Sequence, residues 1–137
     1  MIKEVKILNK REMIRMIKNL GLNKPGCIIC MGSALMIHGL RQETHDIDVA
    51  VSDAVFKEYL KKGYQIDENI SRERILIIKD GIEIELFRDL VTDIECEKIN
   101  GVYVQTLESI IKWKTKLGRD KDKKDIEVIK DFINKNK

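Results

Sequence analysis

The stretch that most constrains this chain is residues 31–52, MGSALMIHGLRQETHDIDVAVS. It holds a Gly-Ser step at Gly32 and Ser33 and, after twelve intervening residues, two aspartates, Asp46 and Asp48, separated by one apolar residue. Residues i and i+2 of a β-strand point to the same face, about 7 Å apart. Two carboxylates at that spacing suit Mg²⁺, which takes one or two carboxylates and leaves its other positions to water and substrate phosphates.

The Gly-Ser step lies between an apolar run at 27–31 and a helix-like segment at 34–40. In a strand-to-helix turn of this kind, Gly32 lets the backbone come close to a phosphate. Ser33 is expected to cap the helix, whose free N–H groups attract anions. The sequence therefore predicts a phosphate-binding turn that faces a metal site.

This combination resembles the signature of the nucleotidyltransferase superfamily that includes DNA polymerase beta. In that signature an apolar residue, Gly, and Gly or Ser are followed about a dozen residues later by Asp, an apolar residue, and Asp or Glu. A lone Asp-x-Asp is often only a solvated strand face, and the Gly-Ser at the right distance with an apolar strand behind it weakens that alternative. The resemblance implies an α/β (α+β) nucleotidyltransferase fold, a small mixed β-sheet flanked by helices, in a single domain over residues 1–137.

A third acid is expected on the run at 82–87, where apolar residues alternate with Glu83 and Glu85. Members of this superfamily usually add a carboxylate from a neighbouring strand, and Glu85 fits that place best, with Glu83 as the alternate. The residue is more often Asp in relatives, and the extra methylene of Glu shifts the geometry of a metal ligand or base. The competing interpretation is a strand whose polar face is simply solvated.

The apolar periodicity predicts helices and strands in alternation, with an Asp80-Gly81 turn that signals a two-residue hairpin. The expected elements are a helix at 9–20 that Gly21 ends, a strand at 27–31, a helix at 33–40, a strand at 46–51, a helix at 53–60 that Gly63 ends, a short strand at 64–66, strands at 74–79, 82–87 and 102–105, and helices at 106–117 and 125–133.

The tail resembles the closing segment of many small nucleotidyltransferases, including those of antibiotic-modifying and toxin–antitoxin groups. Lys114 and Arg119 are the candidates there for binding nucleotide phosphates or for holding the last helices in place. The alternative is a solvated basic face, with Asp122 and Asp125 in surface ion pairs.

The remaining reactive side chains have structural interpretations. Cys27 and Cys30 form a C-x-x-C, but on a strand this spacing sends them to opposite faces, and no second Cys or His pair completes a zinc site. We expect buried free thiols. His38 is expected to pack within its helix, and Trp113 within the core or at its edge, while His45, just before the aspartates, is a weaker candidate for touching substrate.

Composition sets broad limits. The chain has 137 residues, 43% of them hydrophobic and 36% charged, which is enough for one modest core. It has no apolar run of membrane-spanning length and no signal-like start, so we expect a cytoplasmic protein without membrane contact. The net charge of +3 gives little reason to expect nucleic acid, although the segment 112–124 is basic. Nucleic-acid binding therefore ranks last among the functions considered.

The resemblance implies an enzyme in which Asp46, Asp48 and Glu85 bind two Mg²⁺ ions, with Mn²⁺ as a substitute. The nucleotide is an NTP, with ATP expected. A hydroxyl acceptor would attack the α-phosphate and pyrophosphate would leave. The acceptor stays open: a small molecule such as an antibiotic, a protein, or an RNA end. The alternative function is an antitoxin-type protein that binds or nucleotidylates a helical toxin. A homodimer mate or that partner could complete the acceptor site.

Overall fold

The computed structural model describes residues 7–67, 73–88 and 94–136, and its centre is one six-stranded mixed β-sheet with the strand order β3-β4-β2-β1-β6-β5. This confirms the expected mixed α/β architecture. The strands are β1 (Cys27–Ile29), β2 (Asp46–Val51), β3 (Arg74–Lys79), β4 (Ile82–Phe87), β5 (Cys96–Ile99) and β6 (Val102–Gln105). The helices are α1 (Lys10–Asn19), α2 (Met31–His38), α3 (Asp53–Lys61), α4 (Leu107–Leu117) and α5 (Asp120–Lys135).

Successive side chains of the central strands point to opposite faces of the sheet. Ile47, Val49 and Val51 of β2 enter the large core, to which α1, α2 and α3 contribute their apolar faces. Ala50 of β2 belongs instead to a smaller cluster on the other face, together with Cys30. The even-numbered side of β2, which carries both aspartates, therefore faces away from the main core.

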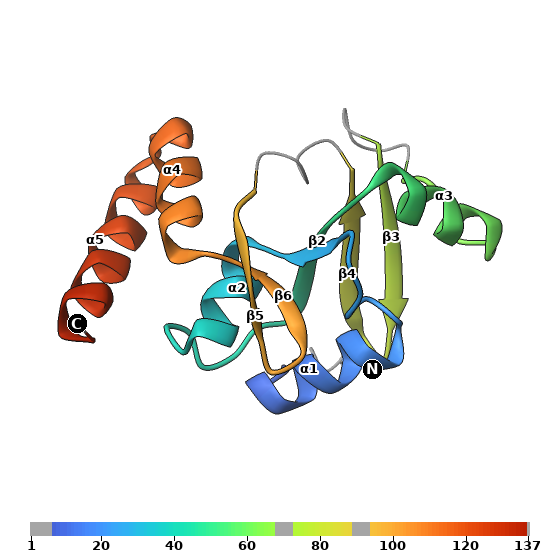
Figure 1. Ribbon diagram of the computed structural model, residues 1–137, viewed down its shortest axis with the longest axis horizontal. Helices are drawn as coiled ribbons and strands as arrows, with labels where there is room; N and C mark the ends of the chain where they lie inside the picture. Colours follow the sequence, from blue (N-terminus) through green and yellow to red (C-terminus); the bar gives the residue numbers. More distant parts are fainter. Residues whose placement is uncertain (1–6, 68–72, 89–93, 137) are drawn as a thin grey trace, which may run out of the picture.

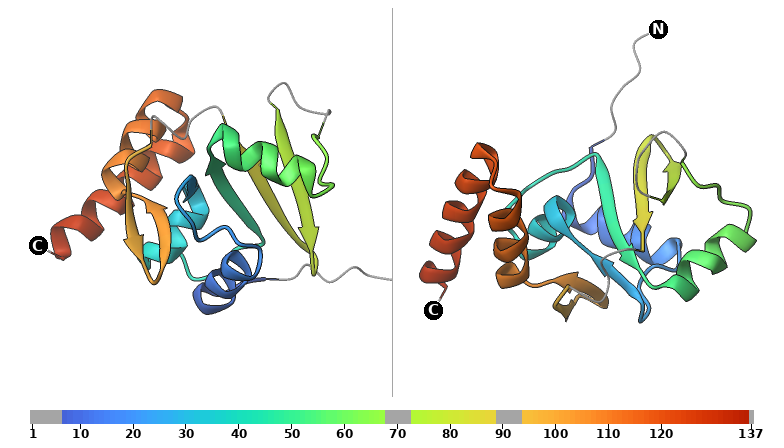
Figure 2. Two further views of the ribbon diagram at one scale, coloured as in Figure 1. Left: turned by 45° about the vertical axis from the view of Figure 1, so that its right-hand side comes forward. Right: turned by 90° about the horizontal axis from the view of Figure 1, so that it is seen from above.

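The helices are unevenly distributed around the sheet. α4 and α5 lie side by side at one end, and α3 lies at the opposite end near β3 (Figures 1 and 2). α1 runs beneath the sheet, close to the turn between β3 and β4 (Figure 1). In the described ranges, no helix is long and apolar enough to span a bilayer.

Local signals explain most element ends. Asn9 caps α1 through a reciprocal capping box with Glu12. Ser52 caps α3 and Thr106 caps α4, each by accepting the N–H three residues later. The Asp80-Gly81 hairpin forms as predicted, with both residues at positive φ (52° and 81°), as a type I′ turn requires.

Four sequence expectations need correction. β5 was not predicted, because three of its four side chains are exposed and its polar and apolar residues do not alternate. The expected strand at 64–66 is only a single bridge between Ile66 and Ile75. α5 begins at Asp120 rather than at Asp125. α2 begins at Met31, two residues earlier than expected, so the strand expected at 27–31 ends at Ile29.

Candidate active site

The acids meet on two adjacent parallel strands. β2 pairs with β4 so that Asp46 lies opposite Glu83 and Asp48 lies opposite Glu85. Paired residues of neighbouring strands point to the same face, with backbones about 4.8 Å apart. The side chains of Asp46, Asp48 and Glu85, which we call the acid face, therefore share one side of the sheet.

Ser33 ties α2 to the strand that carries the aspartates. Its side chain is fully buried, and its Oγ accepts the N–H of Asp48 (3.0 Å) and donates to the carbonyl of Asp46 (3.3 Å). The prediction that Ser33 is the helix N-cap is wrong, because Cys30 is the N-cap and Ser33 lies inside the first turn. The Ser33 hydroxyl fixes the backbone between the two acids. Ser33 can therefore offer a ligand only its backbone N–H.

The first residue of α2 has an unusual backbone. Met31 has φ of 55°, a left-handed conformation that non-glycine residues adopt at a cost. Its N–H donates to Oε1 of the fully buried Gln105 (3.0 Å), and Nε2 of Gln105 donates to Ser109 Oγ (3.0 Å). A buried amide on β6 thus orients the start of α2, directly beside Gly32.

Gly32 lies directly beneath the guanidinium of Arg41. A Cβ at Gly32 would meet Arg41 Nη1, the far end of a flexible and exposed side chain that can move aside. Arg41 is exposed and lies in the loop that follows α2. Arg41 thus places a positive charge over the start of the helix, where the dipole already favours anions.

The acid face has a shortage of positive charge. Burial, followed by the charges of Asp46 and Glu85, raises the pKa of Asp48 to about 7, and Arg74 opposes that rise. Arg74 contacts the Glu85 carboxylate through Nη1. One arginine therefore faces three carboxylates, and the excess negative charge favours binding of a cation.

Asp46 is held by its own loop. Thr44 is buried, and its Oγ1 donates to Asp46 Oδ1 (3.0 Å). The backbone of Thr44 also pairs with Leu8 through two hydrogen bonds (2.6 and 3.1 Å). The carboxylate therefore has a fixed orientation at the start of β2.

The number of carboxylates that the acid face offers determines whether it can hold a divalent ion. Across the described ranges, no three His, Cys, Asp or Glu side chains form a ready metal-holding group. Glu85 is ion-paired with Arg74 instead. Asp46 and Asp48 still supply the one or two carboxylates that Mg²⁺ typically takes from a protein when phosphates supply the rest. The residues therefore fit such an ion when a nucleotide brings its phosphates.

Lys114 and Arg119 lie in a separate group of charges. Lys114 Nζ is buried and lies 2.9 Å from Asp125 Oδ2 and 3.6 Å from Asp122 Oδ1. Arg119 binds the buried Asp122 carboxylate through Nε (2.6 Å) and Nη2 (3.0 Å). We call these four residues the helix-pair cluster, because they join α4 to α5. This is the helix-holding role that the sequence left open, and nucleotide binding by Lys114 and Arg119 stays a prediction.

The histidines and cysteines outside the acid face have the following places. His38 Nε2 donates to the carbonyl of Gln105 (2.8 Å), which joins α2 to β6. His45 is exposed. Cys27 and Cys30 are buried free thiols in different core clusters, as expected from their opposite faces.

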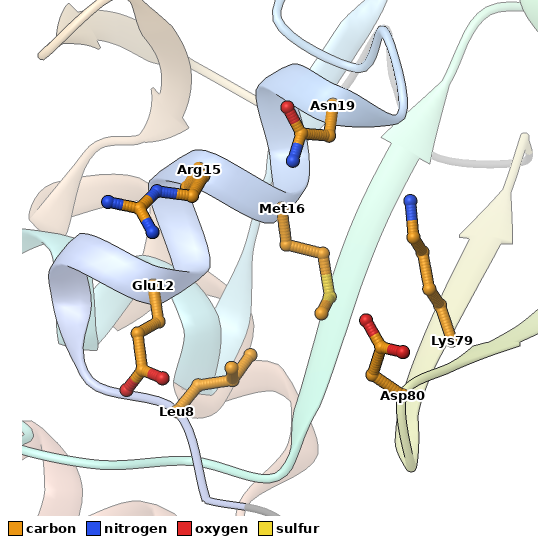
Figure 3. A pocket seen from close by; sticks show the side chains of 7 residues that line it. All are labelled: Leu8, Glu12, Arg15, Met16, Asn19, Lys79 and Asp80. Atoms are coloured by element: carbon orange, nitrogen blue, oxygen red, sulfur yellow. The ribbon is translucent and has the colours of Figure 1, made fainter.

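The pocket in Figure 3 lies elsewhere, between α1 and the β3–β4 turn. Glu12, Arg15 and Asn19 approach it from α1, and Lys79 and Asp80 approach it from the turn (Figure 3). Its volume is about 150 Å³, below the roughly 300 Å³ at which small-molecule sites usually begin. No residue of the acid face lines it. This pocket is therefore separate from the acid face.

Sequence reasoning missed three residues that shape the site. Arg74 could have been found, because the Asp80-Gly81 turn fixes the hairpin register and places Arg74 diagonally across from Glu85. Thr44 had a weak local signal, two residues before Asp46. Gln105 had none, since its contact with α2 joins residues 74 positions apart.

A small mixed sheet with acids on adjacent parallel strands beside a Gly-Ser helix start defines the class of nucleotidyltransferase folds. The chain belongs to the family described as "Nucleotidyltransferase of unknown function (DUF6036)", whose model matches residues 7–135. Its fold is similar to the crystal structure of a proposed nucleotidyltransferase from Thermotoga maritima, with a TM-score of 0.60 and 16% sequence identity over 93% of this chain and 96% of the other. At that identity the likeness shows the fold. Among curated proteins, none matches this chain in sequence.

Proposed function

We propose that this protein transfers a nucleoside monophosphate from an NTP to a hydroxyl acceptor, with release of pyrophosphate. The observation that carries the proposal is the β2–β4 register, which brings Asp48 opposite Glu85 on the face that also bears Asp46. The Gly32-Ser33 helix start is bonded to the same strand. Family membership supports the general class.

The acids would hold Mg²⁺, or Mn²⁺ in its place, with two ions as the expected number. Asp46 and Asp48 are the first ligands, and Glu85 is the third when it is free of Arg74. When bound, such ions neutralise the phosphates and stabilise the attacking and leaving oxygens of an in-line displacement.

The start of α2 would receive the triphosphate. The N–H of Met31 is already given to Gln105, so the N–H groups of Gly32 and Ser33 are the ones available at the helix start. Arg41 lies directly over Gly32 and adds a positive charge there. A helix N-terminus with an arginine above it favours phosphate oxygens.

The acceptor O–H bond breaks as its oxygen forms a bond to the α-phosphorus, and the bond from that phosphorus to the pyrophosphate oxygen breaks. Glu85 or Asp48 would take the proton, and the pairing of the two residues on one face supports this assignment. The acceptor is a small molecule, a protein or an RNA end, and a partner protein such as a helical toxin is one member of that class.

The test measures binding before turnover. Titration calorimetry with ATP and Mg²⁺ should show binding to the wild-type chain and none to Asp46→Ala or Asp48→Ala, because each variant loses a carboxylate that faces the ions. Glu97→Ala, which removes an exposed carboxylate on the edge strand β5, is the matched control and should bind normally. Circular dichroism checks that every variant is folded.

Pyrophosphate release is then followed with each NTP and a panel of small-molecule, protein and RNA acceptors. Unchanged ATP affinity in both aspartate variants would refute the metal assignment and, with it, the proposed reaction.

A further inference from the structure

Arg74 bridges two carboxylates at the edge of the acid face. Its Nη1 contacts Glu85 Oε1, and its Nη2 lies 3.3 Å from Asp67 Oδ2. The Arg74 side chain is 21% exposed, and its Nε is buried with no hydrogen-bond partner in the part of the chain that is described. The guanidinium is thus largely enclosed by acids and still has an unused donor.

The position of Arg74 follows from the hairpin. β3 pairs with β4 so that Leu76 lies opposite Glu85, and Arg74 lies two residues further along on the same face. Side chains at such diagonal positions are within reach of each other when one of them is long. Arg74 on β3 therefore approaches Glu85 on β4 from one side, while Asp46 and Asp48 lie on β2 at the other side of β4.

The contact has a consequence for metal binding. A carboxylate that accepts hydrogen bonds from a guanidinium uses the same oxygen lone pairs that would coordinate an ion. Two cations next to one carboxylate also repel each other, strongly so in a site shielded from water. Arg74 and a divalent ion therefore compete for the carboxylate of Glu85.

We propose that Arg74 is a built-in counter-cation that competes with the divalent ion for Glu85, and that Asp67 retains the guanidinium when Glu85 turns to the ion. Arg74 is then a positioning residue that sets how tightly the acid face binds metal. This inference rests on the proposed function, because it takes Glu85 as the third ligand.

Asp67 is suited to the second half of this role. Its N–H donates to the carbonyl of Arg74 (2.8 Å), and Ile66 bridges to Ile75. These backbone contacts keep Asp67 beside Arg74 whichever carboxylate the guanidinium holds. The arginine can release Glu85 without leaving its ion pair with Asp67.

The test is binding of Mn²⁺ together with ATP, which supplies the phosphate ligands, measured by titration calorimetry. Arg74→Met removes the competing charge, so Mn²⁺ should bind more tightly by up to about fivefold, the effect expected of one partly exposed ion pair. Asp67→Asn leaves Arg74 more committed to Glu85, so Mn²⁺ should bind more weakly. A role that is only structural would move both variants in the same direction.

Arg88→Met is the matched control. Arg88 also bridges two carboxylates, with Nη1 2.8 Å from Asp53 and Nη2 in contact with Glu73, but neither belongs to the acid face. Its removal should leave Mn²⁺ affinity unchanged. If Arg74→Met does not fold, Asp67→Asn decides the question alone, since weaker binding supports the inference and unchanged or tighter binding overturns it.

The outcomes separate this inference from the proposed function. Mn²⁺ binding that is lost in Asp48→Ala but unchanged or weakened in Arg74→Met overturns the competition by Arg74 and leaves the metal site standing. Mn²⁺ binding that does not depend on Asp48 in either wild type or Arg74→Met overturns both.

Discussion

The acid face and the helix-pair cluster are both partly buried groups of charged side chains, and they differ in the balance of positive and negative charge. The acid face has three carboxylates and one arginine in contact with Glu85. The helix-pair cluster has two carboxylates, one lysine and one arginine, all joined by ion pairs. In a group with equal numbers of positive and negative side chains, the charges neutralise one another. In a group with excess negative charge, binding of a cation lowers the free energy.

The aspartates of the two regions have opposite pKa shifts. Burial and neighbouring acids raise the pKa of Asp48 to about 7. Hydrogen bonds from the Arg119 side chain hold the pKa of Asp122 down to about 2. The opposite pKa shifts show that its partners stabilise the charged form of Asp122, whereas burial and neighbouring acids destabilise the charged form of Asp48.

The largest expected effect concerns the role of Glu85 in the acid face. Glu85→Gln should lower the rate of pyrophosphate release about 100-fold, with a smaller loss of ATP affinity, because Asp46 and Asp48 still hold the ions. Glu83→Gln, on the same strand and face but opposite Asp46, should change the rate little. Steady-state kinetics with calorimetry measure both quantities. A larger loss in Glu83→Gln than in Glu85→Gln would move the third role to Glu83.

A second prediction sets the two regions against each other in stability. Lys114→Met should destabilise the protein by about 2 kcal/mol, since it leaves the buried Asp122 with Arg119 alone and deprives Asp125 of its partner. Asp48→Asn should leave stability unchanged or raise it, because it removes a repelling charge. Urea unfolding measures both free energies. Equal destabilisation in the two variants would contradict the contrast.

The smallest expected effect appears only in acid. A carboxyl group with a folded-state pKa of about 2 and an ordinary unfolded value near 3.9 contributes stability above about pH 4, and this contribution is lost as the pH falls towards 2. The difference in Tm between wild type and Asp122→Asn should therefore be constant from pH 7 to about 5 and shrink between about 4 and 2. A difference that does not vary with pH would show that the Asp122 charge contributes nothing.

The sequence was sufficient where local rules determine structure. The bounds of β2, β3, β4 and β6 agree with those expected, because apolar alternation and Gly-containing turns mark them. The acid pair was found from its spacing on a strand and Glu85 from the family resemblance, and the sheet brings all three to one face.

The sequence was insufficient where long-range contacts decide. β5 is an exposed edge strand whose only strong signal was the Asn100-Gly101 turn that joins it to β6, with positive φ at both residues (52° and 83°). The role of Ser33 was misassigned, since its hydroxyl bonds to β2 rather than to its own helix. Burial of Lys114 depends on how α4 packs against α5, which no local pattern reveals.

The pairing of β2 with β4 also means that the separation between the three acids is set by the register of the sheet. Shifting β4 by a single residue would turn Ile84 towards the aspartates and bury a glutamate. Conversely, a relative could lengthen or shorten every connection between these strands and still keep Asp46, Asp48 and Glu85 at the same separation. Insertions in these connections are thus compatible with an unchanged arrangement of the three acids.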